Sequence, residues 1–318
     1  MRLAFVFPGQ GSQAVGMMNG FDAHPAVRET FDEASQALGQ DLWALVTQGP
    51  QDDLDLTVNT QPVMLTAAIA VWRAWLAAGG RAPALLAGHS LGEYSALVAA
   101  GALTFRDALP LVRFRAQAMQ DAVAPGEGAM AAILGADDDT VVAACRKGAE
   151  GHIVEPANYN APGQLVIAGE RAAVERAMQA ARELGARRAV LLPVSAPFHS
   201  SLLKPAAEKL AARLAQVPFV APCIPVVHNV DVAEHSSPDG IRAALAAQAA
   251  SPVRWTQTIQ AFAAAGVTHV VECGPGKVLA NLVKRIDGRL EAFALTSGSM
   301  LDDTRAQLAA WRDDNAGG

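Results

Sequence analysis

The stretch Gly88-His89-Ser90-Leu91-Gly92 follows the apolar run Ala82–Ala87 and precedes the helix-like stretch Glu93–Ala100. A serine between two glycines, at the junction of a buried strand and a helix, is typical of a nucleophile elbow. Because glycine has no Cβ atom, the backbone can turn sharply here and the helix can pack close to the strand. The pattern predicts that the Ser90 hydroxyl stands at the carboxyl edge of a sheet, beside helix N–H groups that can stabilise an oxyanion. From these residues alone, Ser90 could also be a turn residue that caps the following helix.

The order of apolar runs and helical patterns predicts an α/β protein whose large domain has a mostly parallel sheet. The run Leu3–Phe7 predicts a first buried strand, and the glycine-rich loop Pro8–Ser12 follows it. Proline suits the first turn of a helix, so Thr60-Gln61-Pro62 predicts that a helix begins there. The end of the chain, 313–318, is expected to fray. Further helices are expected at 24–38, 106–122, 201–216, 239–249, 255–265 and 277–285, and further strands at 84–87, 224–227 and 268–271.

The pattern changes between Gly126 and Val194, where the order of elements becomes βαββαβ. This order is the ferredoxin-like unit, which can close a small sheet of its own. We therefore expect a large α/β catalytic domain of residues 1–125 and 195–318, interrupted by an inserted ferredoxin-like subdomain at 126–194. Its strands are expected at 129–134, 153–157, 164–168 and 188–192, and its helices at 138–149 and 171–184.

Composition and charge exclude several classes of protein. The net charge of −6 argues against nucleic acid as the main partner, because phosphate binding needs a basic surface. The three cysteines match neither a disulfide framework nor the spacing of metal ligands. The N-terminal apolar run ends too soon, at Pro8, to be a signal peptide, and no apolar stretch reaches the roughly 18 residues of a membrane span. We expect a cytoplasmic protein that binds neither nucleic acid nor membranes.

A serine hydroxyl needs a base to remove its proton near neutral pH. His199 and His228 both follow predicted strands, at the sheet edge where loops gather. The rigid segment Pro193–Phe198 leads to that edge and modestly favours His199. No aspartate is an obvious partner for this histidine, and a backbone carbonyl could orient it instead. His89 is adjacent to Ser90, but its ring would leave the elbow in another direction, so a structural role is expected.

Four motifs occur in order over most of the chain. They are Phe7-Pro8-Gly9-Gln10-Gly11-Ser12-Gln13, Thr60-Gln61-Pro62, Gly88-His89-Ser90-Leu91-Gly92-Glu93-Tyr94 and Glu272-Cys273-Gly274-Pro275-Gly276. Together they resemble the acyltransferase family of fatty-acid and polyketide synthesis, from about Leu3 to Arg285. The fold of this family also contains an inserted ferredoxin-like unit, in agreement with the reading of residues 126–194.

The resemblance implies a role for each main site residue. Ser90 would be the nucleophile and His199 its base. In this family a backbone carbonyl orients the histidine, and here it would belong to Gln248, which fits the absence of an obvious aspartate. The backbone N–H groups of Gln10 and Leu91 would form the oxyanion hole.

The acyl pocket is also implied by the resemblance. Arg115 matches the arginine that binds the free carboxylate of a malonyl group, and a guanidinium offers the planar pair of donors that suits a buried carboxylate. From the residues alone Arg115 could be a solvated helix residue, with Arg113, which would face elsewhere on the helix, as its natural control. Gln61 and Asn160 match other pocket positions. Phe198 matches the position where a phenylalanine accompanies malonyl specificity, because its ring leaves no room for an α-methyl branch.

The implied reaction moves a malonyl group from malonyl-CoA, through a malonyl-serine intermediate, to the phosphopantetheine thiol of an acyl carrier protein, which supplies fatty-acid chain elongation. It implies no metal or redox cofactor, coenzyme A as product, and a monomer. Coenzyme A and carrier proteins are anionic, as is this chain, so a local basic patch is expected. The candidates for this patch are Lys277, Lys284, Arg285, Arg187 and Arg188.

Three other functions remain open on the sequence. The same fold could serve as the malonyl-transferring subunit of malonate decarboxylase, with a different partner. A serine hydrolase would share the elbow and the histidine but would not need an arginine for an anionic acyl group. A non-catalytic module that docks carrier proteins would form no acyl-enzyme, and the presence of Ser90 and His199 argues against it.

Overall fold

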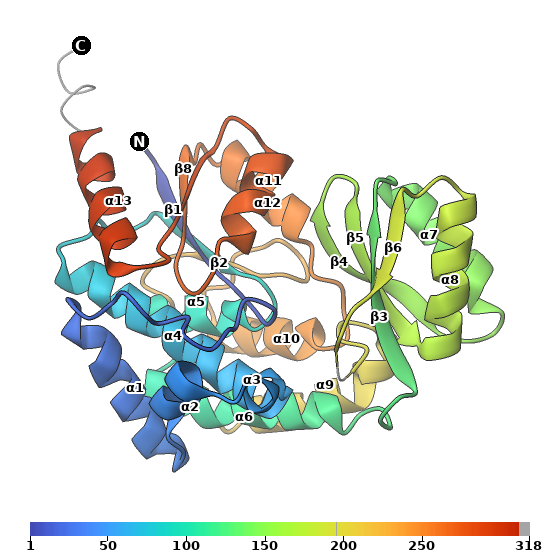
Figure 1. Ribbon diagram of the computed structural model, residues 1–318, viewed down its shortest axis with the longest axis horizontal. Helices are drawn as coiled ribbons and strands as arrows, with labels where there is room; N and C mark the ends of the chain where they lie inside the picture. Colours follow the sequence, from blue (N-terminus) through green and yellow to red (C-terminus); the bar gives the residue numbers. More distant parts are fainter. Residues whose placement is uncertain (195, 312–318) are drawn as a thin grey trace.

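The computed structural model describes residues 1–194 and 196–311, which form two β-sheets with their helices (Figure 1). The end that was expected to fray, 313–318, lies outside these residues. The first sheet has the strand order β7-β2-β1-β8-β9, and all of its paired strands are parallel. The expected α/β fold with a parallel sheet is therefore confirmed. The strands of this sheet are β1 (Leu3–Phe7), β2 (Leu85–Gly88), β7 (Val226–Val227), β8 (His269–Glu272) and β9 (Glu291–Ala294).

Helices cover both faces of the first sheet. Successive side chains of a strand point to opposite faces, so each strand contributes to two separate apolar clusters. On β1, Leu3, Phe5 and Phe7 belong to one buried apolar cluster, whereas Ala4 and Val6 belong to another. The first cluster includes α1 (Pro25–Leu38), α4 (Thr57–Ala77), α5 (Gly92–Ala99), α6 (Phe105–Gln120), α9 (Lys204–Leu214) and α10 (Pro238–Gln248). The second includes α11 (Trp255–Ala264) and α12 (Val278–Ile286). Burial on both faces explains the continuous apolar runs that mark these strands in the sequence.

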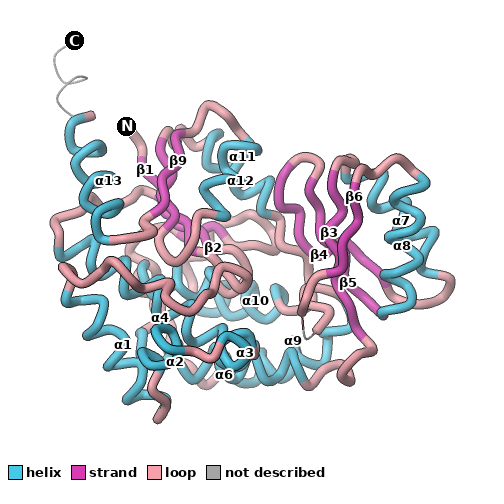
Figure 2. The backbone as a smooth tube through the Cα atoms, in the orientation of Figure 1, coloured by secondary structure: helices cyan, strands magenta, loops and turns pink. Residues whose placement is uncertain are grey.

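The second sheet is antiparallel and has the order β4-β5-β3-β6 (Figure 2). Two helices cover the face that points away from the first sheet, and the chain order βαββαβ with this strand order is the ferredoxin-like arrangement. The elements are β3 (Gly128–Leu134), α7 (Asp138–Ala149), β4 (Val154–Ala161), β5 (Gln164–Glu170), α8 (Arg171–Glu183) and β6 (Arg188–Leu191). All of them lie within 126–194; the division into domains at those boundaries stays a prediction.

Backbone contacts connect the two sheets. Val253, which precedes α11, forms a parallel bridge with Asn158 of β4. Its N–H donates to the carbonyl of Ala157 at 2.9 Å, and its carbonyl accepts from the N–H of Tyr159 at 2.9 Å. These bonds fix β4 against the segment that leads into α11, so residues from both sheets can line one cavity.

Several elements differ from the sequence prediction. Pro62 does not begin a helix but lies inside α4, which starts at Thr57. Pro62 is the sixth residue of α4, beyond the first turn, so its missing N–H removes one intrahelical hydrogen bond. The sequence prediction also missed α2 (Leu42–Gln48), α3 (Gln51–Asp55), β9 and α13 (Gly298–Ala310), which are short or lie at the edge of the fold. No helix among the described residues has the length and apolar character that crossing a membrane requires.

Candidate active site

Ser90 lies in the tight turn between β2 and α5, with a left-handed φ of 53°. A Cβ atom at Gly88 would lie 1.9 Å from the backbone of Gly92, and one at Gly92 would lie 2.0 Å from the carbonyl oxygen of Phe7. Only glycine therefore fits on either side of the serine. The Ser90 N–H donates to Oδ1 of Asn229 at 2.7 Å, and Nδ2 of Asn229 donates to the Gly88 carbonyl at 2.7 Å. Asn229 thus holds both ends of a backbone conformation that is unfavourable for serine.

His199 is the histidine that the structure brings to Ser90. Its Nε2 lies 2.7 Å from Oγ of Ser90, and its Nδ1 lies 2.9 Å from the main-chain carbonyl of Gln248. The carbonyl can only accept, so Nδ1 carries the proton and Nε2 accepts from the serine hydroxyl. His228, which spacing alone left open, lies elsewhere: its Nδ1 is 2.7 Å from Oε1 of Glu93 and its side chain is fully buried.

The environment of His199 keeps its imidazole neutral. Burial, and next the positive charge of Arg115, lower the pKa of His199 to about 3, although the hydrogen bond to the Gln248 carbonyl acts in the opposite direction. Both effects disfavour the imidazolium ion. At neutral pH the ring can therefore accept the proton of Ser90.

Arg115 comes from α6 and is 2% exposed. Its Nη1 donates to Oε1 of Gln61 at 2.8 Å, and its Nη2 donates to Oε1 of Gln248 at 2.8 Å and to Oγ of Ser90 at 3.1 Å. Burial lowers the pKa of Arg115, but an arginine starts so high that it keeps its charge. Arg113, on the same helix, instead donates to the Leu38 carbonyl at 3.4 Å. The alternative that Arg115 is a solvated helix residue is wrong, because its guanidinium is buried beside the elbow.

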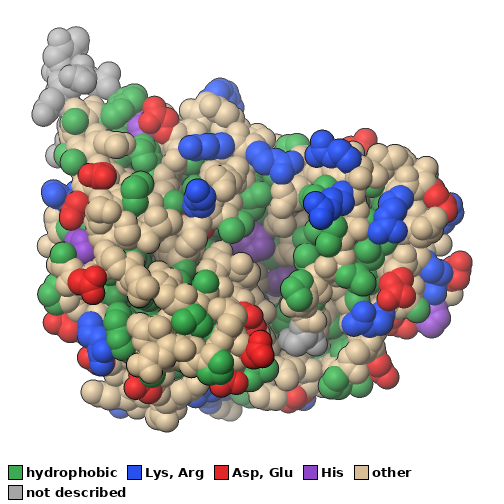
Figure 3. Space-filling model, in the orientation of Figure 1, with side chains coloured by type: hydrophobic (Ala, Val, Ile, Leu, Met, Phe, Trp, Pro, Cys, Tyr) green, Lys and Arg blue, Asp and Glu red, His purple; other side chains and the backbone are tan. Residues whose placement is uncertain are grey.

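A cavity of about 570 Å³ opens in front of Ser90, and Figure 3 shows this hollow with histidine side chains inside it. Residues from both sheets line it, as the connection through β4 allows. Its lining residues include Gln10, Gln61, Ser90, Leu91, Arg115, Met130, Asn158, Leu192, Phe198 and His199. Met130 and Asn158 belong to the second sheet and Leu192 directly follows its strand β6; the sequence analysis did not single out any of the three.

The two residues expected to form the oxyanion hole both line this cavity. Leu91 is the N-cap of α5, so its N–H belongs to the helix N-terminus, where backbone donors have no intrahelical acceptor. Gln10 lies in the loop after β1, and its Oε1 accepts from the hydroxyl of Thr57 at 2.8 Å. Thr57 also accepts from Nε2 of Gln61 at 3.2 Å, so one buried hydroxyl connects the two glutamines.

Other predicted residues have different positions. Phe198 lines the cavity with His199, and its role in acyl selection stays a prediction. Asn160 is not among the described residues that line the cavity, and its Oδ1 lies 2.8 Å from Nε2 of His89. His89 also lines the cavity, and its ring packs edge-on against Trp255; the structural role expected for it stays a prediction.

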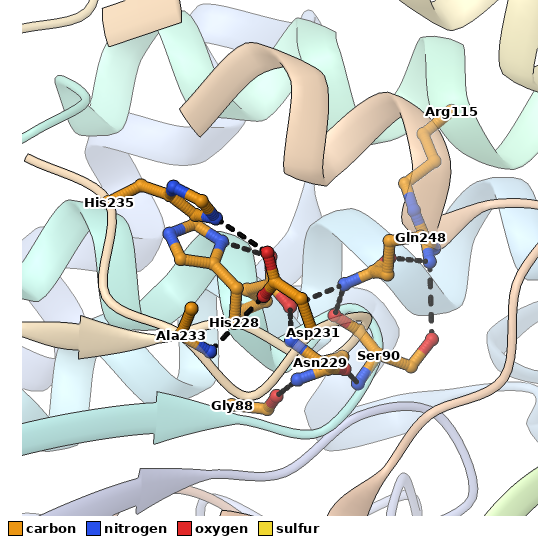
Figure 4. A network of polar contacts seen from close by, with 10 residues as sticks. Gly88, Ser90, Arg115, His228, Asn229, Asp231, Ala233, His235 and Gln248 are labelled. Atoms are coloured by element: carbon orange, nitrogen blue, oxygen red, sulfur yellow. Dashed lines mark hydrogen bonds and ion pairs between the residues drawn. The ribbon is translucent and has the colours of Figure 1, made fainter. Parts of the chain in front are cut away.

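A buried polar network behind the elbow was not found from the sequence (Figure 4). Glu93 is fully buried and accepts hydrogen bonds from His228, from the Asn229 N–H and from the side chain of Gln248. These partners are more than 130 residues away in the chain, so no local pattern signals them. Within the described residues no three His, Cys, Asp or Glu side chains are grouped so that they could hold a metal ion.

An elbow serine that donates to a neutral histidine, at the carboxyl edge of a parallel sheet, defines the class of α/β enzymes that use a nucleophilic serine. Comparison with known proteins then gives the family. The model of the family described as acyl transferase domain matches residues 4–303, and the chain belongs to this family.

Several relatives are similar over nearly their whole length. The malonyl CoA-acyl carrier protein transacylase of Escherichia coli (strain K12) is 55% identical over 94% of this chain and 97% of its own. A crystal structure of an acyl-carrier-protein S-malonyltransferase from Burkholderia pseudomallei 1710b is 61% identical, with a TM-score of 0.95 over 96% of this chain and all of that one. A malonyl-transacylase in complex with its type II polyketide synthase acyl-carrier protein is 50% identical, with a TM-score of 0.95 over 96% of this chain and all of that one.

Proposed function

We propose that this protein transfers the malonyl group of malonyl-CoA to the phosphopantetheine thiol of an acyl carrier protein, through a malonyl ester of Ser90. One observation carries the proposal beyond acyl transfer in general: a buried guanidinium, Arg115, lies 3.1 Å from the oxygen that would carry the acyl group. A buried cation is costly unless an anion or several acceptors satisfy it. The free carboxylate of a malonyl group on Ser90 is an anion that can approach the Arg115 guanidinium.

The first half-reaction follows from the proton positions in the dyad. Nε2 of His199 takes the proton of Ser90 as Oγ attacks the thioester carbon. The N–H groups of Gln10 and Leu91 stabilise the resulting oxyanion. As the carbon–sulfur bond breaks, His199 returns the proton to the coenzyme A sulfur, which leaves the malonyl ester on Ser90.

The second half-reaction reverses these steps with a different thiol. His199 takes the proton of the phosphopantetheine thiol, whose sulfur attacks the ester, and then returns the proton to Oγ of Ser90. Only acyl groups and protons move, so the proposal includes no cofactor. Water must be excluded from the ester, and Arg115, His199 and Leu91, which line the cavity beside it, are all buried.

The partners imply a basic surface near the cavity. Figure 3 shows Lys and Arg side chains along the upper edge of the molecule, above the hollow, with Asp and Glu side chains below it. Lys284 and Arg285 lie in the last turn of α12. Arg285 also donates to Oε1 of Gln164 at 2.7 Å, so this edge joins α12 to the second sheet. We assign the phosphates of coenzyme A and the acidic carrier protein to this basic side, and a monomer suffices because one chain supplies every site residue.

The test is to incubate the purified protein with malonyl-CoA and, separately, with acetyl-CoA, followed by intact mass and peptide mapping. The expected result is a malonyl adduct on Ser90, little acetyl adduct, and no adduct in Ser90→Ala. Addition of a phosphopantetheinylated carrier protein should move the malonyl group to it. Rapid release of free malonate without an adduct would indicate a hydrolase. Neither adduct nor turnover would indicate a docking module.

A further inference from the structure

Glu93 is a buried carboxylate for which the proposed mechanism has no role. It lies in the first turn of α5, three residues after the nucleophile, and its side chain is fully buried. Oε1 lies 2.7 Å from Nδ1 of His228, and Oε2 accepts from the Asn229 N–H at 2.9 Å and from Nε2 of Gln248 at 3.0 Å. Burying a charged carboxylate is unfavourable unless it is paired and hydrogen-bonded. This network satisfies the carboxylate, and it connects Glu93 directly to Gln248.

The Gln248 amide has one favourable orientation in this network. Its Nε2 donates to the Ser90 carbonyl at 2.9 Å as well as to Glu93, so both of its protons are used on one side. Its Oε1 therefore faces Nη2 of Arg115 at 2.8 Å. The reversed amide would place Oε1 against two acceptors, and its NH₂ group against a guanidinium that can only donate. Glu93, together with the Ser90 carbonyl, therefore holds the Gln248 amide with its oxygen toward Arg115.

We propose that Glu93 is a positioning residue for acyl selection: it fixes the Gln248 amide, which fixes the Arg115 guanidinium for an anionic acyl group. The inference rests on the proposed function, since it assigns Arg115 the acyl carboxylate. Gln248 also accepts from Nδ1 of His199 through its main-chain carbonyl, at 2.9 Å. That bond does not involve the side-chain amide of Gln248. Loss of Glu93 should therefore displace Arg115 more than it displaces His199.

Two conservative variants separate the reach of the Glu93 side chain from its charge. Glu93→Asp keeps the charge but withdraws the oxygens by one methylene, so the bond to Gln248 is lost. Glu93→Gln keeps the reach: its amide oxygen can accept from Asn229 and Gln248 in place of Oε2. Its NH₂ group then faces Nδ1 of His228, which accepts once that ring carries its proton on Nε2.

His228 can make this change. Burial lowers the pKa of His228, but the Glu93 carboxylate, and after it Asp231, raise it, and the net shift is upward. Replacing the carboxylate with an amide removes the main effect that raises this pKa, which favours the neutral ring. Nε2 of His228 has no hydrogen-bond partner among the described residues, so moving the proton there breaks no bond. The Gln variant is therefore expected to rescue what the Asp variant loses.

The experiment measures the rate of Ser90 acylation by malonyl-CoA and by acetyl-CoA, over a range of concentrations, with time-resolved intact mass. Since one hydrogen bond to a charged group is at stake, Glu93→Asp should lower the malonyl-to-acetyl ratio of kcat/KM about 10-fold or more, mainly through a higher KM for malonyl-CoA. Glu93→Gln should stay within about 3-fold of the wild type, because its hydrogen bonds persist. Glu272→Gln is the matched control: Glu272 is also a fully buried carboxylate, but it accepts from the Ala280 N–H at the start of α12, and its ratio should not change.

Two results would overturn the inference. If Glu93→Asp keeps the malonyl-to-acetyl ratio of kcat/KM and Glu93→Gln lowers it, acyl selection depends on the charge of Glu93 and not on its hydrogen bond to Gln248. If both variants slow malonyl and acetyl transfer equally, Glu93 only supports the fold. The proposed function is tested separately, by whether the wild-type protein forms malonyl-Ser90 at all.

Discussion

Replacing Arg115 with alanine should remove the preference for malonyl while leaving the nucleophile intact. The guanidinium can give two charge-assisted hydrogen bonds to a carboxylate, and each such bond is worth about 1.5–3 kcal/mol. Their loss raises the barrier by about 3–6 kcal/mol, which corresponds to a decrease of roughly 10²–10⁴-fold in kcat/KM for malonyl-CoA. An acetyl group has no carboxylate, so its transfer should fall by about 10-fold only, the value of one such bond at the low end of this range, for the single contact between Arg115 and Oγ of Ser90.

The assay is the same acylation of Ser90, measured with both thioesters. Arg113→Ala is the matched control, because Arg113 lies on the same helix but donates to the Leu38 carbonyl, away from the elbow. It should leave both rates close to those of the wild type. Equal losses for malonyl and acetyl in Arg115→Ala would refute the assignment of Arg115 to the acyl carboxylate, as would unchanged malonyl transfer.

Three further outcomes are expected. Phe198→Ser enlarges the cavity beside the histidine, so the malonyl-to-methylmalonyl rate ratio should fall by about 10-fold; an unchanged ratio would exclude Phe198 from acyl selection. Reversing the charges of Lys284 and Arg285 should raise KM for the carrier protein at low salt and much less at high salt. Reversing the charge of Lys147, on the outer helix α7, should leave this KM unchanged. If both changes had the same effect on KM, the carrier protein would dock elsewhere. The His199 pKa of about 3 keeps its ring neutral in an NMR titration from pH 7 down to about pH 4. An unfolded histidine binds its proton near pH ~6.5, so His199 makes the free energy of unfolding decrease as the pH falls from about 6.5 toward 3. If His199 titrated near pH ~6.5 in the folded protein, the neutral base would be contradicted.

The sequence predicted what depends on local patterns. The elbow around Ser90 and the βαββαβ order of the second sheet follow from glycine spacing and apolar periodicity, and the structure has both. The start of α4 was predicted wrongly, because Pro62 tolerates a place slightly inside a helix. β9 has four residues and an exposed or half-buried pattern, so it offers no strong apolar signal.

Outside the four motifs, the candidate site could be predicted only through the resemblance to the family. Spacing left His199 and His228 as alternatives, and the resemblance was needed to choose between them. The partners of Glu93 could not be found, because each is more than 130 residues away and none belongs to a motif. From the residues alone the burial of Arg115 could not be predicted either, because two arginines two positions apart on a helix do not reveal which face of the helix is covered.

The acceptor that orients His199 is a main-chain atom, and this changes what mutagenesis can detect. Gln248 is the last residue of α10, where carbonyl groups lack an intrahelical donor, so its oxygen is available to the imidazole. No substitution at this position deletes a carbonyl. A scan that replaces side chains one at a time would therefore record the amide contacts of Gln248 and miss its part in the dyad, whereas replacing the following amide bond with an ester would weaken that carbonyl as an acceptor without altering any side chain.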